Sequence, residues 1–159
     1  MPGLEDLYRE IILDHYKSPR NRGELPAPPA HRVEGLNPLC GDEVVLYAAV
    51  DGDTLTDVRF TGAGCSISQS SASMMAAAVK GKSVEEIRRL THAFKAMMSI
   101  HEHEGDPDAD HDHLGEVRLG DLEALKGVVK FPARIKCATL AWNALNQALD
   151  EAQAEVGAP

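Results

Sequence analysis

The sequence predicts an α+β domain, in which helices pack on one face of a small three-stranded antiparallel sheet. Two strand-like runs, 43–51 and 54–61, are joined by Asp51-Gly52-Asp53, which is typical of a tight hairpin. The second run alternates polar and apolar residues, so one face of the sheet is expected to be covered and the other polar. Segments on both sides of this hairpin space their apolar residues by three and four, as helices with one buried stripe do. Helices on one face of an antiparallel sheet define the α+β class.

The N-terminal third supplies one helix and one edge strand. Apolar residues between Leu4 and Tyr16 fall on one helical stripe, and Pro19 ends that helix because a proline bars its predecessor from helical geometry. Residues 23–30 contain three prolines and are expected to form an extended strap. Residues 31–35 fit a short edge strand.

The C-terminal part is predicted to be helical. Gly62-Ala63-Gly64 leads into a helix running to about Lys80, with a buried stripe at Ile67, Met74, Met75, Ala78 and Val79. Ser83-Val84-Glu85-Glu86 is a capping box, which predicts a helix start. Asp121 opens a short helix carrying Leu122, Leu125 and Val128, and a last helix follows Pro132.

Composition limits the classes of function. The chain has 159 residues, enough for one domain over 1–159, with 16 basic and 25 acidic residues and a formal net charge of −9. This charge argues against a nucleic-acid or acidic-membrane partner. No apolar run approaches the roughly 20 residues that span a bilayer, and the N-terminus lacks signal-peptide features. Three widely spaced cysteines favour free thiols in a reducing cytoplasm, where they serve metal binding or chemistry.

The cysteines form the candidate site. Cys40, Cys65 and Cys137 each fall at a junction between predicted elements, and Asp42 stands beside the first. Three sulfurs and one oxygen are a full tetrahedral ligand set for zinc. The alternative for any single cysteine is a small buried hydrophobic residue, and the absence of a Cys-x-x-Cys pair leaves both interpretations open.

Two neighbouring features bear on this site. Gly62-Ala63-Gly64 does not fit a phosphate loop, because a dinucleotide fingerprint needs a third glycine where Ile67 stands. These glycines are better explained by a sharp turn that delivers Cys65 to the start of a helix, where unpaired amides favour a thiolate. Arg134, three residues before Cys137, is a candidate to compensate the negative charge of a zinc–thiolate site, or else a plain surface cation.

A rival metal site is the histidine- and acid-rich stretch 101–113. Histidine-rich tracts bind metals, but a solvated loop offers no fixed ligand geometry. His15, His31 and His92 are interpreted as lone structural or exposed histidines. The serines at 66–71 indicate no hydrolase, because nothing in the sequence places a histidine beside them.

Four motifs together resemble the IscU/NifU-like iron–sulfur assembly proteins. They are Leu7-Tyr8-Arg9 through Pro19-Arg20-Asn21, Asn37-Pro38-Leu39-Cys40-Gly41-Asp42, Gly62-Ala63-Gly64-Cys65-Ser66-Ile67, and Lys136-Cys137-Ala138. They occur in the family's order and cover nearly the full chain. The resemblance implies an IscU/NifU N-terminal-like fold.

The chain departs from the pattern of IscU-type scaffolds in three places, and in all three it looks like the SufU branch of that family. Lys136 occupies the position of a histidine in IscU-type scaffolds. The stretch Lys130-Phe131-Pro132-Ala133-Arg134 stands where those scaffolds carry a Leu-Pro-Pro-Val-Lys chaperone-binding sequence. A segment around 90–121 looks like an insertion. The missing histidine argues against a stable cluster on this chain.

The resemblance implies a zinc-dependent sulfurtransferase that serves a SufS-type cysteine desulfurase, with downstream Suf assembly proteins or apo-acceptors as further partners. Carried over by motif, zinc is held by Cys40, Asp42, Cys65 and Cys137. Cys40 is the expected catalytic acceptor of persulfide sulfur, since it lies on a loop beside Gly41 while the other two cysteines are held by helices. The alternative is a scaffold on which a [2Fe–2S] cluster is assembled, with iron or a transient cluster in place of zinc.

Overall fold

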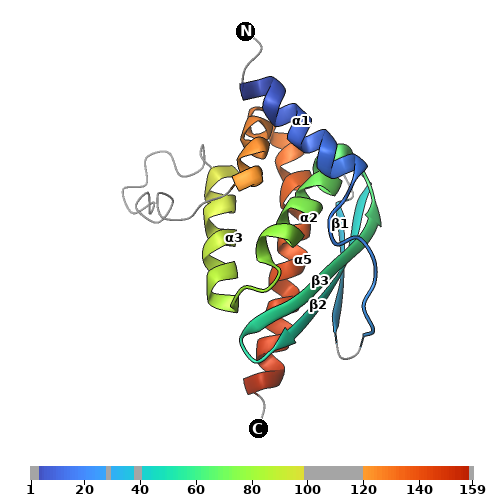
Figure 1. Ribbon diagram of the computed structural model, residues 1–159, viewed down its shortest axis with the longest axis vertical. Coiled ribbons are helices and arrows are strands. Elements are labelled where there is room, and N and C mark those ends of the chain that lie inside the picture. Colours follow the sequence, from blue (N-terminus) through green and yellow to red (C-terminus); the bar gives the residue numbers. More distant parts are fainter. Residues whose placement is uncertain (1–3, 28–29, 38–40, 99–119, 158–159) are drawn as a thin grey trace.

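The computed structural model describes residues 4–27, 30–37, 41–98 and 120–157 (Figure 1). In chain order the elements are α1 (Leu4–Lys17), β1 (His31–Asn37), β2 (Asp42–Asp51), β3 (Thr54–Ala63), α2 (Ser66–Val79), α3 (Val84–Met98), the 3₁₀-helix η1 (Gly120–Lys130) and α5 (Pro132–Gly157). Every helix and strand predicted from the sequence within these ranges is present. The α+β prediction is confirmed.

The sheet is antiparallel with strand order β1-β2-β3. The β2–β3 hairpin closes where Asp51 pairs with Thr54, as its Asp-Gly-Asp turn predicts. Residues 21–23 lie along the outer edge of β3, where the N–H of Gly23 donates to the carbonyl of Phe60 at 2.9 Å. The Phe60 N–H donates in turn to the Asn21 carbonyl at 3.1 Å, so the edge of β3 is covered at Phe60.

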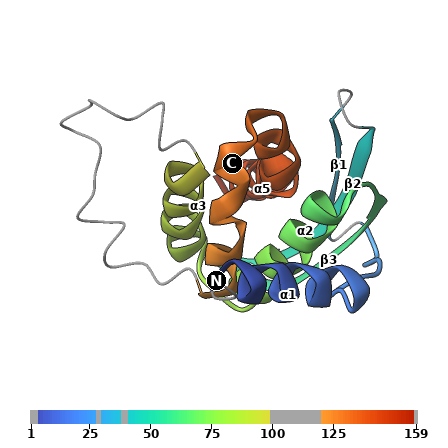
Figure 2. The same ribbon diagram turned by 90° about the horizontal axis from the view of Figure 1, so that it is seen from above.

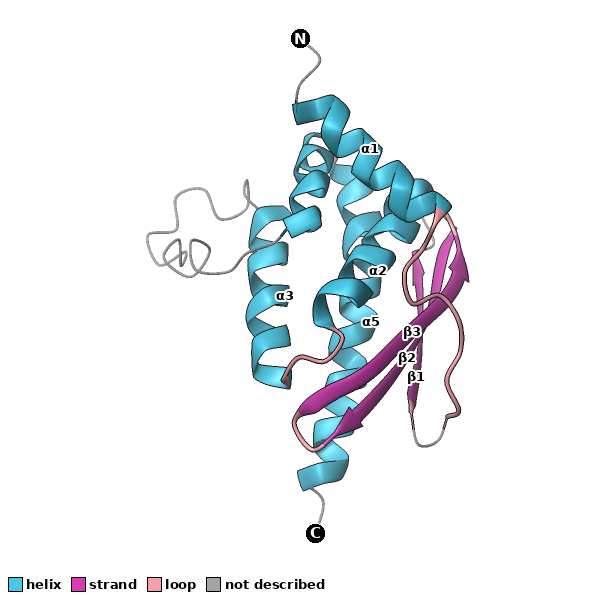
Figure 3. Ribbon diagram, in the orientation of Figure 1, coloured by secondary structure: helices cyan, strands magenta, loops and turns pink. Residues whose placement is uncertain are grey.

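The helices lie on one side of the sheet, as expected (Figures 2 and 3). Helix α5 packs on β1 and β2, and α2 packs on β3. Gly35 of β1 allows α5 to approach, since a Cβ there would lie 3.2 Å from Leu140 of α5 and 3.1 Å from Val44 of β2. Placing α2 and α5 against one face of the sheet brings the ends of the strands next to the starts of both helices.

Helix α2 is enclosed more fully than its apolar stripe predicted. Its buried residues run without a break from Ser68 to Ala76, whereas Ile67 and Ala78 are only partly buried. The prediction of a single stripe was too narrow because α1, α5, η1 and β3 all contact this helix. Small side chains let these neighbours approach, and the serine hydroxyls are satisfied: Ser71 Oγ donates to the Ala138 carbonyl at 2.5 Å.

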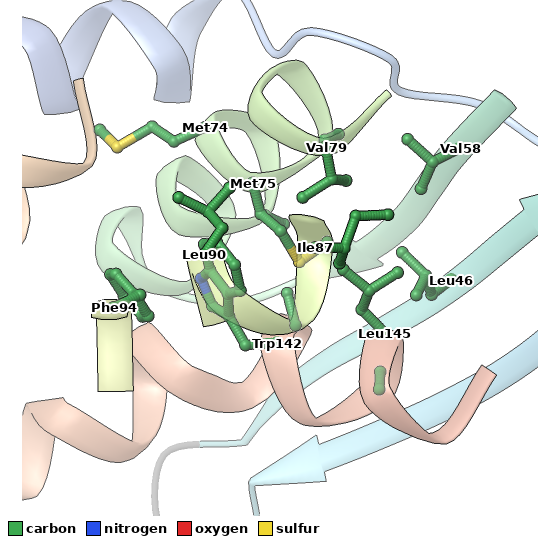
Figure 4. Packing of buried hydrophobic residues seen from close by; sticks show 14 of the residues in the cluster. Leu46, Val58, Met74, Met75, Val79, Ile87, Leu90, Phe94, Trp142 and Leu145 are labelled. Carbon is green, nitrogen blue, oxygen red and sulfur yellow. The ribbon is translucent and has the colours of Figure 1, made fainter. Parts of the chain in front are cut away.

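The core lies between α2, α3, α5 and the sheet (Figure 4). Trp142 of α5 stacks on Phe94 of α3 with ring centroids 4.5 Å apart. The three predicted apolar residues of η1 are all buried, and their spacing of three matches the period of a 3₁₀-helix: Leu122, Leu125 and Val128. The capping box at Ser83 forms, with the Glu86 N–H donating to Ser83 Oγ at 3.1 Å.

The segment expected as an insertion, around 90–121, begins inside regular helix, since α3 continues to Met98. Residues 99–119, which include the 101–113 histidine tract, lie outside the described ranges. The prediction that residues 1–159 form one domain stays a prediction. None of the helices in the described ranges combines the length and apolar character needed to cross a bilayer.

Candidate metal centre

Three of the four predicted ligands meet at one point. Ligand atoms of Asp42, Cys65 and Cys137 all lie within 4.8 Å of one another. They come from the first residue of β2, the N-cap of α2 and the second turn of α5. Sulfur ligands bind zinc at about 2.3 Å, which puts the ligand atoms of one tetrahedral ion roughly 4 Å apart. Cys40 lies outside the described residues.

Asp42 is fully buried, with no exposed surface. Its Oδ1 accepts the backbone N–H of Cys65 at 2.9 Å, and its Oδ2 lies 3.8 Å from Cys65 Sγ, with the thiol as donor. A buried carboxylate with such partners is fixed in orientation. The carboxylate therefore joins the start of β2 to the start of α2.

The pKa of Asp42 reflects two opposing effects. Burial raises it, because the charged form loses water. Hydrogen bonds from Cys137, from the backbone and side chain of Cys65, and from Ser68 lower it, and together they bring the pKa of Asp42 below its usual range. The side chain is thus an anion near neutral pH, the form in which a carboxylate binds a metal.

Two glycines make the approach of Cys65 to Asp42 possible. Gly62 has φ +143°, and a Cβ there would collide with the carbonyl oxygen of Glu43 on β2. A Cβ on Gly64 would lie 2.5 Å from Asp42 Oδ1 and 2.7 Å from Ser68 Oγ. The Gly-Ala-Gly turn therefore allows close packing around Cys65, and it delivers Cys65 to the start of α2, as predicted from the sequence.

Cys137 is buried deeply on α5, and its sulfur has a neighbour that sequence reasoning missed. The side-chain amide of Asn37 donates to Cys137 Sγ at 3.7 Å. Asn37 ends β1 and pairs with Asp42 across the ladder. The only sequence signal was a polar residue at the end of a strand beside the first cysteine motif.

The packing of α2 on α5 fixes the separation of Cys65 and Cys137. Ser71 on α2 accepts the indole N–H of Trp142 at 3.3 Å while donating to the carbonyl next to Cys137, that of Ala138. Both cysteines are free thiols. Two thiols and one carboxylate held this way can bind a soft divalent ion such as zinc.

Arg134 does not belong to this group of ligands. It is exposed and lines a groove beside α1 and η1. Its predicted role in charge compensation stays a prediction.

The histidines are placed partly as expected. His15 is buried and structural, but it is not lone: Nδ1 lies 2.8 Å from Ser73 Oγ and Nε2 lies 3.1 Å from Asp121 Oδ2. Ser73 Oγ also accepts the backbone N–H of Arg20 at 2.8 Å, so its hydroxyl proton is free to bond Nδ1, which places the ring proton on Nε2. A serine–histidine–aspartate row therefore exists, but Ser73 has no exposed surface and cannot meet a substrate.

Comparison with known proteins identifies the family of this chain. Residues 7–138 match the family model of the NifU-like N-terminal domain, which covers most of the chain. The chain belongs to the NifU-like N-terminal domain family. The predicted resemblance is confirmed.

Relatives of this NifU-like chain carry two kinds of name. It is 48% identical over 144 residues to the zinc-dependent sulfurtransferase SufU of Bacillus subtilis, covering 91% of this chain and 90% of that protein. It is 42% identical over 146 residues to the iron–sulfur cluster assembly scaffold protein IscU of Streptococcus pyogenes, covering 92% and 84%. The crystal structure of a NifU-like protein (N-terminal) from Brucella abortus superposes with a TM-score of 0.77 at 25% identity, over 98% of this chain and all of that one.

Proposed function

We propose that this chain is a zinc-dependent sulfurtransferase of iron–sulfur cluster assembly. In this role it takes persulfide sulfur from a SufS-type cysteine desulfurase onto Cys40 and delivers it to downstream Suf assembly proteins or apo-acceptors. The observation that carries the proposal is the buried carboxylate of Asp42 set between two cysteine thiols. Similarity to SufU over nine-tenths of the chain supports the same activity. The odd number of cysteines suits a reducing cytoplasm.

The residues fit zinc. Two thiols and one carboxylate would supply three ligands, and Cys40, two residues before Asp42 in the chain, would supply the fourth. When bound, zinc keeps its cysteine ligands deprotonated at neutral pH. Three thiolates and a carboxylate carry four negative charges against two positive ones, so nearby hydrogen-bond donors such as the amide of Asn37 help to hold them.

Cys40 is the thiol suited to accept sulfur. Cys137 is buried and Cys65 sits at the start of α2, whereas Cys40 precedes Gly41, whose φ of +69° marks a turn between β1 and β2. The Cys40 thiolate attacks the outer sulfur of the donor persulfide. A new S–S bond forms on Cys40 as the donor S–S bond breaks, and the donor cysteine leaves as a thiolate. The sulfur moves without any outside oxidant or reductant.

Asp42 has a different role. A carboxylate oxygen cannot carry persulfide sulfur, so Asp42 stays a ligand while Cys40 reacts. Its hydrogen bond to the Cys65 backbone holds it in place whatever Cys40 does.

The experiment measures the metal first and the activity second. Purified protein is analysed for metal content, and cysteine desulfurase turnover is measured with and without it. We expect about one zinc per chain and clear stimulation of turnover. Cys40→Ala is expected to abolish both persulfide loading and stimulation, and stimulation by this variant would remove Cys40 from the acceptor role. Asp42→Ala is expected to lose zinc, and a full equivalent in that variant would show the carboxylate to be dispensable.

A second candidate is the scaffold function, which the similarity to IscU supports. Here a [2Fe–2S] cluster is the cargo, assembled on the same cysteines. Anaerobic loading with iron and sulfide distinguishes the two: a stable brown protein that passes its cluster to an apo-acceptor favours the scaffold. Lys136, where IscU-type scaffolds have histidine, leads us to expect no stable cluster.

A further inference from the structure

A groove of about 790 Å³ lies at the starts of α2 and α5, the helix that Cys65 caps and the helix that carries Cys137. Its walls come from α1, the start of α2, η1 and the start of α5, and they are mostly apolar: Ile12, Leu13, Ile67, Ala124, Val128 and Phe131. Phe131 is 63% exposed, unusual for a large aromatic side chain. Part of this surface is therefore left without cover in the isolated chain.

Two residues that line the groove are close in the chain to Cys65 and Cys137. Ser66 lines it and follows Cys65, and Arg134 lines it one helical turn before Cys137. A protein segment in the groove would thus lie next to the start of α2 and α5, where the cysteines are held.

The charge of the groove is opposite to that of the chain. Its charged lining residues among those described are Arg9 and Arg134, both cationic, whereas the whole chain has a net charge of −9. Both arginines are exposed, and none of the carboxylates whose side chains the structure describes forms an ion pair with Arg9. The groove therefore favours an apolar segment that carries carboxylates.

The walls are fixed before any partner binds. The buried ring of His15 on α1 contacts Ser73 on α2 and Asp121 on η1, which ties three of the four walls together. A preformed groove keeps the entropy cost of docking low.

We propose that this groove docks an apolar segment bearing carboxylates on the cysteine desulfurase that donates the sulfur. The proposal rests on the proposed function and adds where the donor binds and by what chemistry. Docking there holds the donor persulfide close to the cysteines and raises its effective concentration. A second copy of this chain is the competing occupant, and the experiment separates the two.

One test fills the groove. Gly127 of η1 lines it, and a Cβ at this position meets no heavy atom within 4 Å, so Gly127→Phe adds a ring to the groove without a clash at its base. Gly127→Ala is the matched control. We expect Gly127→Phe to weaken binding of the desulfurase encoded by the same genome at least tenfold by isothermal titration calorimetry, and Gly127→Ala to change it less than twofold.

A second test reverses the charge. Arg9→Glu is expected to weaken the same binding at least fivefold at low salt. Arg88→Glu on α3, outside the groove, is the control and should leave the binding of the desulfurase unchanged.

Zinc content and persulfide loading of Cys40 from inorganic polysulfide should remain as in the wild type for all four variants. The concentration giving half-maximal desulfurase stimulation should rise for Gly127→Phe and Arg9→Glu, while maximal stimulation is retained.

The outcomes separate docking from the function itself. Wild-type stimulation together with unchanged binding by Gly127→Phe and Arg9→Glu overturns the groove and leaves the sulfurtransferase intact. No stimulation by the wild type overturns both. If the two variants change only the oligomeric state on size-exclusion chromatography, the occupant is a second copy and the proposal is wrong.

Discussion

Asn37 and Asp42 face each other across the β1–β2 ladder, and between them they contact both Cys65 and Cys137. The Asn37 amide donates to Cys137 Sγ at 3.7 Å, while the Asp42 carboxylate accepts the Cys65 N–H at 2.9 Å. Directly opposed residues of an antiparallel pair point to the same face of the sheet. One rung of the sheet thus presents a donor to the cysteine of α5 and an acceptor to the cysteine of α2.

Replacing Asn37 by aspartate should weaken zinc binding. Asn37→Asp keeps the shape of the side chain but sets an additional carboxylate against a thiolate in a buried place. Loss of a hydrogen bond to a metal ligand typically costs about 10–100-fold in affinity, and we expect a loss at the upper end of that range. Competition with a chromophoric zinc chelator at pH 7.5 measures the change.

The control for this substitution is Asn143→Asp. Asn143 lies on the exposed side of α5, so the variant adds the same charge to the chain away from the site. Its zinc affinity should equal that of the wild type. Equal affinity in both variants would show that the contact of Asn37 with Cys137 has no part in holding the metal.

Gly64→Ala should damage the site through sterics alone. The new methyl group would lie 2.5 Å from Asp42 Oδ1 and 2.7 Å from Ser68 Oγ, so either the turn or the buried carboxylate has to shift. Overpacking of this kind costs about 1–3 kcal/mol, and we expect a loss in the free energy of unfolding of that size, together with lower zinc content. Urea unfolding of metal-free protein gives the first value and elemental analysis the second. Gly127→Ala, which has open space around it, is the control and should change neither.

The fold was predictable because local signals agreed with one another. The Asp-Gly-Asp turn, the capping box at Ser83 and the spacing of Leu122, Leu125 and Val128 each specify an element without reference to the rest of the chain. Helix α2 was predicted less well, because burial of serines depends on what packs around them. From the sequence alone Ser71 would be taken as a surface residue, whereas in the structure it is buried and bonds to Trp142 and Ala138.

The site was predictable only as a set of ligand types. Cysteines at junctions and a neighbouring aspartate suggested zinc, but nothing in the spacing of Cys65 and Cys137 says that they meet. Asn37 could not be singled out, since its role depends on the register that sets it opposite Asp42. His15 was taken as lone for the same reason: its partners lie 58 and 106 residues away in the chain.

The histidine tract gives a prediction that the sequence alone motivates. Replacing residues 101–113 by a glycine–serine segment of equal length should leave about one zinc per chain, because Asp42, Cys65 and Cys137 lie outside the tract. Metal analysis after dialysis measures this, with Cys65→Ser as the variant that should lose the metal. Loss of the equivalent on replacing the tract would instead make the tract the zinc site.

Ser71→Ala tests whether the packing of α2 on α5 sets the distance between the two helix cysteines. The substitution leaves the indole N–H of Trp142 buried without its partner, and it removes the Ser71 hydrogen bond from the Ala138 carbonyl, which keeps its bond within α5. Such a loss costs about 1–3 kcal/mol in the free energy of unfolding.

Ser70→Ala is the matched control, since the hydroxyl of Ser70 bonds only to the carbonyl of Ile67 in its own helix. Because Ala138 follows Cys137, relaxation at this contact also moves the sulfur, and zinc affinity should fall in Ser71→Ala but not in Ser70→Ala. Urea unfolding followed by fluorescence of Trp142, the single tryptophan of the chain, reports the stability of both variants. Equal losses in the two variants would mean that the serines contribute only to their own helix and that the cysteines are set apart by other contacts.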